Sequence, residues 1–150
     1  MVKVKPHLVN RSLIMMGMVI STFSCHQTPR KFITSDSHLT ILERSLQVNA
    51  NQLQQLDKYG VDENSGLALN IYFVTNDSLK AAKLAEELNP QGYHLNAIHP
   101  SSEDHSLWVL TGSSPMVSMD EAILNKWSSR MCETGFKHDC EFQGWNPVTE

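Results

Sequence analysis

The chain has 150 residues, of which 41% are hydrophobic and 19% are charged, and its formal net charge is −4. An acidic chain of this size does not bind phosphate backbones by charge, which argues against nucleic acid as a direct ligand. It contains no glycine-rich phosphate loop, no H-E-x-x-H and no G-x-S-x-G motif, so we expect no cofactor and no enzymatic activity.

The N-terminal segment has the composition of a secretory signal. Three basic residues, Lys3, Lys5 and Arg11, precede an apolar stretch at 13–20. This stretch is much shorter than the roughly 20 apolar residues that a membrane-spanning helix needs. Its length suits a secretory signal instead. We therefore predict a signal peptide over residues 1–24, with an uncleaved helix as the alternative.

The segment ends in "MMGMVISTFSC", residues 15–25, and its last four residues resemble a bacterial lipobox. Ser24 before Cys25 fits that motif, whereas Thr22 stands where leucine is usual and Phe23 is bulky. Cleavage there would leave 9 basic and 16 acidic residues, a net charge of −7 in the mature chain. We predict lipidation at Cys25, with cleavage without lipid as the alternative.

Residues 25–37 are polar and contain a proline, which is typical of a tether between a lipid and a domain. We assign the folded domain to residues 38–150. The residue after Cys25 is His26 and not the aspartate that commonly retains lipoproteins at the inner membrane. We expect a lipid-anchored envelope protein that faces the periplasm, at the outer rather than the inner membrane, with a cytoplasmic location as the alternative.

The first predicted element of the domain is a helix from Ser37 to Tyr59, with Ser37 as N-cap and Gly60 as its stop. Its spacing is that of a heptad seam with one polar member, Asn49. The seam permits a dimerising coiled coil whose register Asn49 sets, or a helix that docks on its own domain. Three heptads are a minimal dimerisation signal, so we favour docking and expect a monomer or a weak dimer. The seam residues are Leu39, Leu42, Leu46, Asn49, Leu53 and Leu56.

Six further elements follow in the order strand, helix, strand, strand, helix, strand. The first strand, 67–75, is apolar enough to be central in a sheet. Asp77 caps the helix Ser78–Leu88, and the second helix spans Asp120–Gly135. The remaining strands are predicted at 93–99, 105–112 and 139–145. The helix residues expected to point inward are Leu79, Ala82, Ala85 and Leu88, then Ile123, Leu124, Trp127 and Met131.

This order predicts an α+β fold, a ferredoxin-like β-α-β-β-α-β sandwich with a four-stranded antiparallel sheet, preceded by an extra helix. Right-handed crossovers place the two later helices on one face of the sheet, which leaves the other face free unless the leading helix covers it. Asn70, Tyr72 and Val74 point to that free face and are candidate partner-binding residues. Trp145 is a further candidate, although we favour a packing role for it at the edge of the sandwich, next to Gly144.

Two cysteines follow Cys25 in the sequence. Cys132 and Cys140 are separated by seven residues, and in an oxidising compartment such a pair is a disulfide candidate. Two buried thiols are the alternative. The spacing is not C-x-x-C, so it gives no indication of redox catalysis.

Histidines are the weak metal candidates. His99 and His105 flank a five-residue loop, and Glu103 or Asp104 would be a third ligand. By strand alternation His94 is expected to point to the face opposite His99. Two histidines do not make a closed zinc site, so we expect no bound metal and keep a weak metal-binding envelope protein as a distant alternative.

Four stretches carry a family resemblance. They are "LQQLDKYGVDENS" at 53–65, "LNIYFVTNDSLKAAKLAEEL" at 69–88, "QGYHL" at 91–95 and "CEFQGW" at 140–145. In this order they resemble the family of the regulator of ribonuclease E activity B. That family has Tyr-Asp-Gly-Trp near its end, whereas this chain has Phe-Gln-Gly-Trp at 142–145. The resemblance implies a non-enzymatic domain that binds the scaffold region of a ribonuclease and lowers its activity.

The two lines of inference point to different compartments. Ribonuclease E works inside the cell, whereas a lipid at Cys25 would hold the domain outside the inner membrane. We therefore predict a membrane-tethered, protein-binding regulatory module whose partner the sequence does not identify. The alternative is a cytoplasmic protein inhibitor of an endoribonuclease that regulates RNA turnover.

Overall fold

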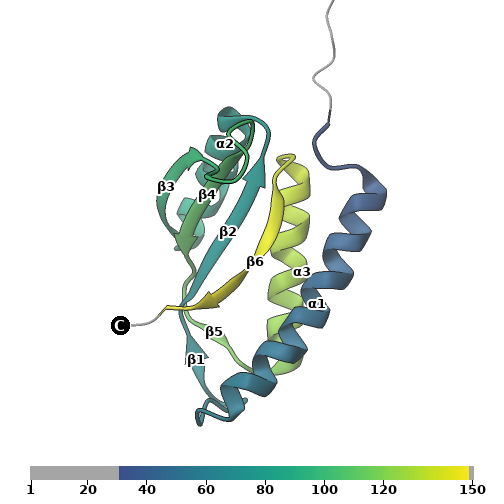
Figure 1. Ribbon diagram of the computed structural model, residues 1–150. Coiled ribbons are helices and arrows are strands. Elements are labelled where there is room, and N and C mark those ends of the chain that lie inside the picture. Colours follow the sequence, from purple (N-terminus) through teal and green to yellow (C-terminus); the bar gives the residue numbers. More distant parts are fainter. Residues whose placement is uncertain (1–30, 149–150) are drawn as a thin grey trace, which may run out of the picture.

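The computed structural model describes residues 31–148, which form a sheet with helices on one side (Figure 1). The predicted order of a leading helix and a β-α-β-β-α-β unit is confirmed, with two additional two-residue strands. The elements are α1 (Ser35–Asp57), β1 (Gly66–Leu67), β2 (Leu69–Thr75), α2 (Ser78–Leu88), the 3₁₀ turn η1 (Asn89–Gln91), β3 (His94–Pro100), β4 (Trp108–Ser113), β5 (Val117–Ser118), α3 (Glu121–Lys137) and β6 (Glu141–Pro147).

The main sheet has the strand order β3-β4-β2-β6, and each neighbouring pair is antiparallel. The first and third long strands of the unit are therefore central, which is the ferredoxin-like arrangement. Strands β1 and β5 form a separate small sheet. Helices α2 and α3 lie behind the main sheet in Figure 1, so the predicted fold class is confirmed.

The central strand β2 separates the two faces of the sheet. Leu69, Ile71 and Phe73 are fully buried against the helices, and the residues between them are half-buried. This pattern follows from the two-residue period of a strand. The ring of Phe73 lies 5.1 Å from that of Phe142 on β6, centroid to centroid, so the two strands share one core beneath α3.

Helix α1 lies beside α3 and strand β6 and does not cross in front of the sheet (Figure 1). Its buried residues, Ile41, Ser45 and Asn49, recur every four positions. Leu39, predicted as the first seam residue, is 59% exposed. The helix thus docks on its own domain. Asn49 is its most deeply buried residue, and Leu42, Leu53 and Leu56 of the predicted seam pack against the core, whereas Leu39 does not. No helix within residues 31–148 is long and apolar enough to cross a membrane.

The folded domain begins earlier than predicted. The N-cap of α1 is Thr34, whose hydroxyl accepts a hydrogen bond from the Ser37 backbone N–H, so Ser37 lies inside the helix. Ile33 is buried in the core, and Phe32 packs against it. Residues 32–37, assigned to the tether from the sequence, therefore belong to the domain. The predicted signal peptide, Cys25 and the rest of the tether lie outside the described residues.

Asp139 holds this N-terminal segment in place. Its carboxylate accepts hydrogen bonds from the backbone N–H groups of Phe32 and Ile33, at 2.8–2.9 Å, and forms an ion pair with Lys80. The backbone of Asp139 has φ +58°, the left-handed region that aspartate tolerates better than most residues. Segments about 107 residues apart in the sequence are joined at this carboxylate.

The inward faces of α2 and α3 differ in part from those predicted. In α2 the buried residues are Ala81, Leu84 and Leu88, and Leu79 is exposed. In α3 Ile123 is 52% exposed. The sheet covers only one side of each helix. Which residues of a helix are buried therefore depends on how the helix is rotated about its axis relative to the sheet. Within α3 the fully buried or nearly buried residues are Leu124, Ser128, Met131, Cys132 and Gly135.

Gly135 does not end α3, which continues to Lys137. It instead permits Cys140, just before β6, to pass close to the helix. A Cβ atom at this position would lie 2.4 Å from the Cys140 carbonyl oxygen and 3.0 Å from the Phe73 ring. Glycine is therefore needed here for close approach of backbone to backbone.

Candidate functional site

The face of the sheet opposite α2 and α3 carries no helix among residues 31–148. Asn70, Tyr72 and Val74 of β2 lie on it, as predicted, and all three are half-buried. The strand register brings side chains of β4 and β3 to the same side, because directly paired residues share a face. We call this surface the open face and define it by Asn70, Tyr72, Val74, Val109, Thr111, Ser113, His94, Ala97 and His99.

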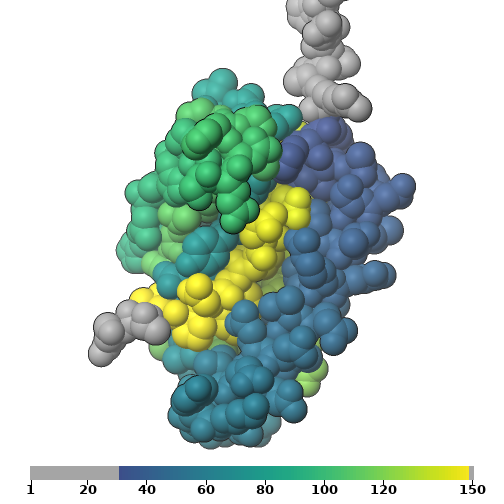
Figure 2. All heavy atoms as spheres, viewed as in Figure 1, coloured from purple at the N-terminus to yellow at the C-terminus, as the bar shows by residue number. Residues whose placement is uncertain are grey.

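Tyr72 is the only large aromatic residue of the open face, and the neighbouring strand β6 holds its hydroxyl group. Asn146 on β6 donates a hydrogen bond to the Tyr72 hydroxyl at 3.2 Å and accepts one from Asn70 at 2.9 Å. Directly across from Tyr72 lies Gly144, where a Cβ atom would meet nothing within 4 Å. The ring is therefore oriented by hydrogen bonds but left uncovered on the β6 side. Figure 2, seen from this side, shows β6 (yellow) at the surface beside α1 (blue).

A bulge in β3 changes the predicted positions of the histidines. The register shifts between Leu95 and Ala97, so His94 pairs with Ser113 and His99 with Val109. Both histidines therefore lie on the open face, and the expectation that they point to opposite faces was wrong. A β-bulge adds one residue to a strand and so shifts the alternation of side chains by one position. Two residues that simple alternation would place on opposite faces then lie on the same face.

The weak metal candidates gain no third ligand from the fold. His99 Nδ1 lies 2.9 Å from the backbone oxygen of Pro100, and His105 is exposed in the turn before β4. Within residues 31–148 no group of three or more His, Cys, Asp or Glu side chains is arranged to hold a metal ion.

Trp145 lies on the opposite side of the sheet from Tyr72. It pairs with Ile71, is 4% exposed, and donates its indole N–H to Asn49 Oδ1 at 2.8 Å. Asn49 is itself fully buried and donates to Ser128 Oγ and Asn125 Oδ1 at 2.9 Å. These contacts join β6, α1 and α3. Trp145 is consequently a packing residue and cannot serve as a partner-binding residue in this conformation.

The two thiols are separate and buried. Cys132 Sγ contacts Ser45 Oγ of α1 at 3.4 Å, whereas Cys140 Sγ points to the His138 carbonyl oxygen at 3.5 Å. The disulfide candidate is therefore not formed in this structure, and the alternative of two buried thiols describes it. Burial raises the pKa of both thiols, that of Cys140 to about 12, so neither is a reactive thiolate at neutral pH.

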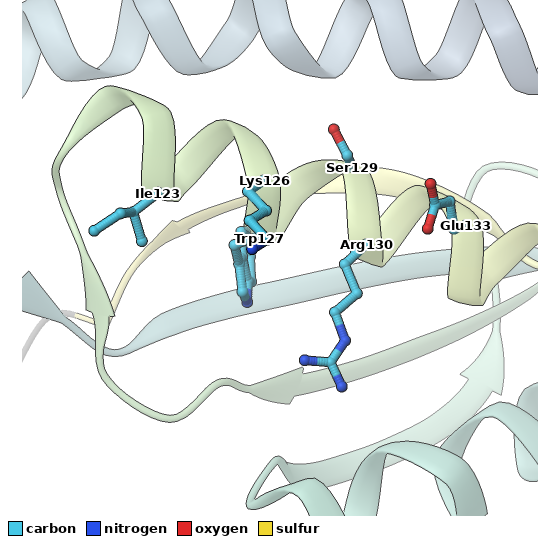
Figure 3. A pocket seen from close by; sticks show the side chains of 6 residues that line it. All are labelled: Ile123, Lys126, Trp127, Ser129, Arg130 and Glu133. Atoms are coloured by element: carbon cyan, nitrogen blue, oxygen red, sulfur yellow. The ribbon is translucent and has the colours of Figure 1, made fainter.

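A second surface lies on the outer side of α3, and sequence reasoning missed it. A cavity of about 630 Å³ is lined there by α3 alone, and an adjoining one of about 420 Å³ shares Trp127 and Arg130 with it. Figure 3 shows the side chains along the helix. We call the combined surface the α3 groove. Its residues are Ile123, Lys126, Trp127, Ser129, Arg130 and Glu133, continued by Gln91, Tyr93, Pro115, Met116 and Val117.

The α3 groove has a rigid aromatic floor. The Trp127 indole N–H donates to the Tyr93 hydroxyl at 3.0 Å, and its ring meets that of Phe142 edge-on, at 6.0 Å between centroids. Arg130 donates to Gln91 Oε1 at 2.6 Å. Burial raises the pKa of Tyr93, so its hydroxyl stays neutral. The sequence signal for this groove was the recurrence of Ile123, Trp127 and Arg130 at helical spacing beside Lys126. We had assigned Ile123 and Trp127 to the inward stripe of this helix and had not considered the two basic residues.

Taken together, the chain is a small ferredoxin-like α+β domain whose surfaces are an uncovered sheet face and a groove along a helix. The family model described as Regulator of ribonuclease activity B matches residues 46–146, which is more than half of the chain. The chain therefore belongs to this family, as the resemblance predicted. The family is one of regulators rather than enzymes, which agrees with a regulatory, protein-binding role. No curated protein matches the sequence.

Proposed function

We propose that this chain is a membrane-tethered regulatory module that binds a protein partner through its open face. A lipid on Cys25 would hold it in the cell envelope, facing the periplasm. The basic start, the short apolar stretch and the small residue before Cys25 support the anchor. Membership of a family of regulators supports the protein-binding role.

The observation that carries the proposal is the uncovered sheet face with an oriented tyrosine. An aromatic ring with a polar tip, held in one position, loses little conformational entropy on binding and is a frequent anchor at interfaces. Apart from Glu141, which pairs with Val74, the residues that strand pairing places on this face include no lysine, arginine, aspartate or glutamate. At its rim Glu141 is neutralised by Arg44, at 2.9 Å. A neutral surface of this kind suits a polypeptide better than a phosphate-rich ligand.

A photo-crosslinking amino acid at position 72 tests the binding surface in growing cells. We expect a crosslinked species that mass spectrometry identifies as one protein partner. The matched control is the same substitution at Tyr59, which is 84% exposed just after the end of α1 and is not part of the sheet that carries the open face. Equal crosslinking from both positions, or none from position 72 in folded protein, would contradict the proposal.

Fractionation and intact-mass measurement test the anchor. We expect the wild-type protein at the membrane, without residues 1–24 and with the added mass of lipid. The Cys25→Ala variant should leave the membrane or remain as an uncut precursor. Wild-type protein recovered from the cytosol with Met1 still attached would contradict the anchor.

The family description favours a second candidate function, a cytoplasmic protein inhibitor of an endoribonuclease. It predicts a cytosolic protein that retains Met1 and slows RNA cleavage by that enzyme when the two are mixed. The same fractionation separates the two candidates, because one protein with an intact N-terminus in the cytosol cannot be lipidated at Cys25.

A further inference from the structure

We propose that the α3 groove is a second binding site, distinct from the open face, for an acidic protein segment that carries an apolar anchor residue. The groove lies on the helix side of the sheet, since Trp127 packs on the buried Phe142. The open face lies on the other side. The two sites can therefore be occupied at the same time.

The apolar part of the α3 groove is exposed to solvent. Ile123 is 52% exposed and Met116 is 70% exposed, and they lie on either side of the half-buried Trp127. Because the indole N–H is already bonded to Tyr93, the surface that Trp127 offers is its apolar ring. Neighbouring exposed apolar side chains around a cavity mark a binding site more often than scattered ones do.

The charge of the site is opposite to that of the chain. Lys126 and Arg130 are one helical turn apart, and within residues 31–148 neither forms an ion pair. Arg130 bonds only to the neutral Gln91, which orients its guanidinium without neutralising it. Among residues 31–148 Arg44, Lys80 and Lys137 contact a carboxylate, whereas Lys31, Lys58 and Lys83, like the two cations of the groove, form no ion pair. Lys126 and Arg130 differ from those three lysines because they lie together beside an aromatic ring, in the lining of one pocket. These two un-neutralised cations beside a tryptophan are complementary to a carboxylate next to an apolar side chain.

The shape and one acidic residue favour a peptide over a lipid surface. The pockets of about 630 and 420 Å³ are open to solvent and have room for a few side chains of a peptide, and polar residues interrupt their apolar lining, whereas a bilayer is bound by a continuous apolar face. Glu133 lines the far end of the groove, and Figure 3 shows Arg130 extending away from it. The carboxylates of the ligand should therefore lie toward Lys126 and Arg130, which gives the bound segment a direction.

Selection from a displayed library of random 12-residue peptides on the full chain, held in detergent, tests the site. We expect selected peptides to be rich in aspartate and glutamate around an aromatic or aliphatic residue. A synthesised representative should lose at least tenfold in affinity for the Lys126→Glu/Arg130→Glu variant. It should also lose affinity for Ile123→Ser, a change at an exposed position that leaves the core intact.

Two controls keep the outcome specific. Lys58→Glu/Lys83→Glu makes the same change in net charge on exposed residues outside the groove and should leave affinity unchanged. Tyr72→Ala, on the open face, should also leave it unchanged. Failure to select peptides, selection of peptides without net negative charge, or equal loss with the control pair would overturn the proposal. Binding of vesicles containing phosphatidylglycerol that depends on Lys126 and Arg130 would overturn it in favour of a membrane surface.

Discussion

Tyr72 and Trp145 are aromatic residues on adjacent strands, one step apart in register, yet they face opposite sides of the same sheet. Trp145 lies under α1, and its N–H is bonded to a fully buried asparagine. Tyr72 is half-buried, and its hydroxyl is held by a surface asparagine. Trp145 joins β6, α1 and α3, whereas the ring of Tyr72 is free to contact a partner. The comparison shows that aromatic character alone does not distinguish a core residue from a binding residue in this fold.

The largest expected effect comes from the covered side. Trp145→Ala should lower the free energy of unfolding by about 3–5 kcal/mol, because a large buried side chain is removed and a cavity remains between α1, α3 and β6. Urea denaturation followed by circular dichroism measures this loss. Tyr72→Ala is the matched aromatic truncation, and equal losses for the two variants would remove the distinction between the faces.

Asn49→Ala should have the next largest effect, about 1–3 kcal/mol. The change leaves the Trp145 N–H and the Ser128 hydroxyl without the buried partner that both now have. Asn51→Ala, an exposed asparagine in the same helix, is the control and should be nearly silent. A small loss for Asn49→Ala would mean that apolar packing alone holds α1 in place.

Asp139→Asn tests whether the charge of Asp139 stabilises the packing of the N-terminal segment on the domain. Burial alone would raise the pKa of Asp139, but hydrogen bonds from Lys80 and from the Phe32 and Ile33 N–H groups together lower it below its usual value. The charged form is therefore stabilised in the folded state. That stability is fully present above the ordinary aspartate pKa of about 4 and is lost as pH falls through the lowered native pKa.

We accordingly expect Asp139→Asn to cost about 1–2 kcal/mol at pH 7, with wild type and variant converging in strongly acidic solution. Thermal melts at several pH values between roughly 2 and 7 measure the difference. Asparagine tolerates the left-handed backbone at this position, so the change isolates the charge. A difference in stability that does not vary with pH would contradict the assignment.

The smallest effect on stability is expected on the open face. Tyr72→Ala should cost less than about 1 kcal/mol because the ring is half-exposed and only the bond from Asn146 is lost. Partner affinity, once a crosslinked partner is in hand, should fall roughly thirtyfold, about 2 kcal/mol. A large loss of stability without a specific loss of binding would place Tyr72 with the core residues and exclude the open face as the binding surface.

The sequence by itself determined the local features of this protein. The two-residue alternation of β2 predicted a central strand, and the N-cap Asp77 predicted the start of α2. Both predictions succeeded because backbone period and capping depend on residues close together in the chain. The order of elements then restricted the topology to the ferredoxin-like one, since crossover handedness leaves few arrangements.

Only the tertiary structure decided which side of each element is buried. Leu79 and Ile123 fit the predicted apolar stripes as well as Leu88, Leu124 and Met131 do, yet the first two are exposed and the other three are fully buried. Trp145 is covered because α1 lies beside β6, and the bulge in β3 brings His94 and His99 to one face. These outcomes depend on contacts between segments that are far apart in the chain. A local sequence pattern gives no information about the free energies of such contacts.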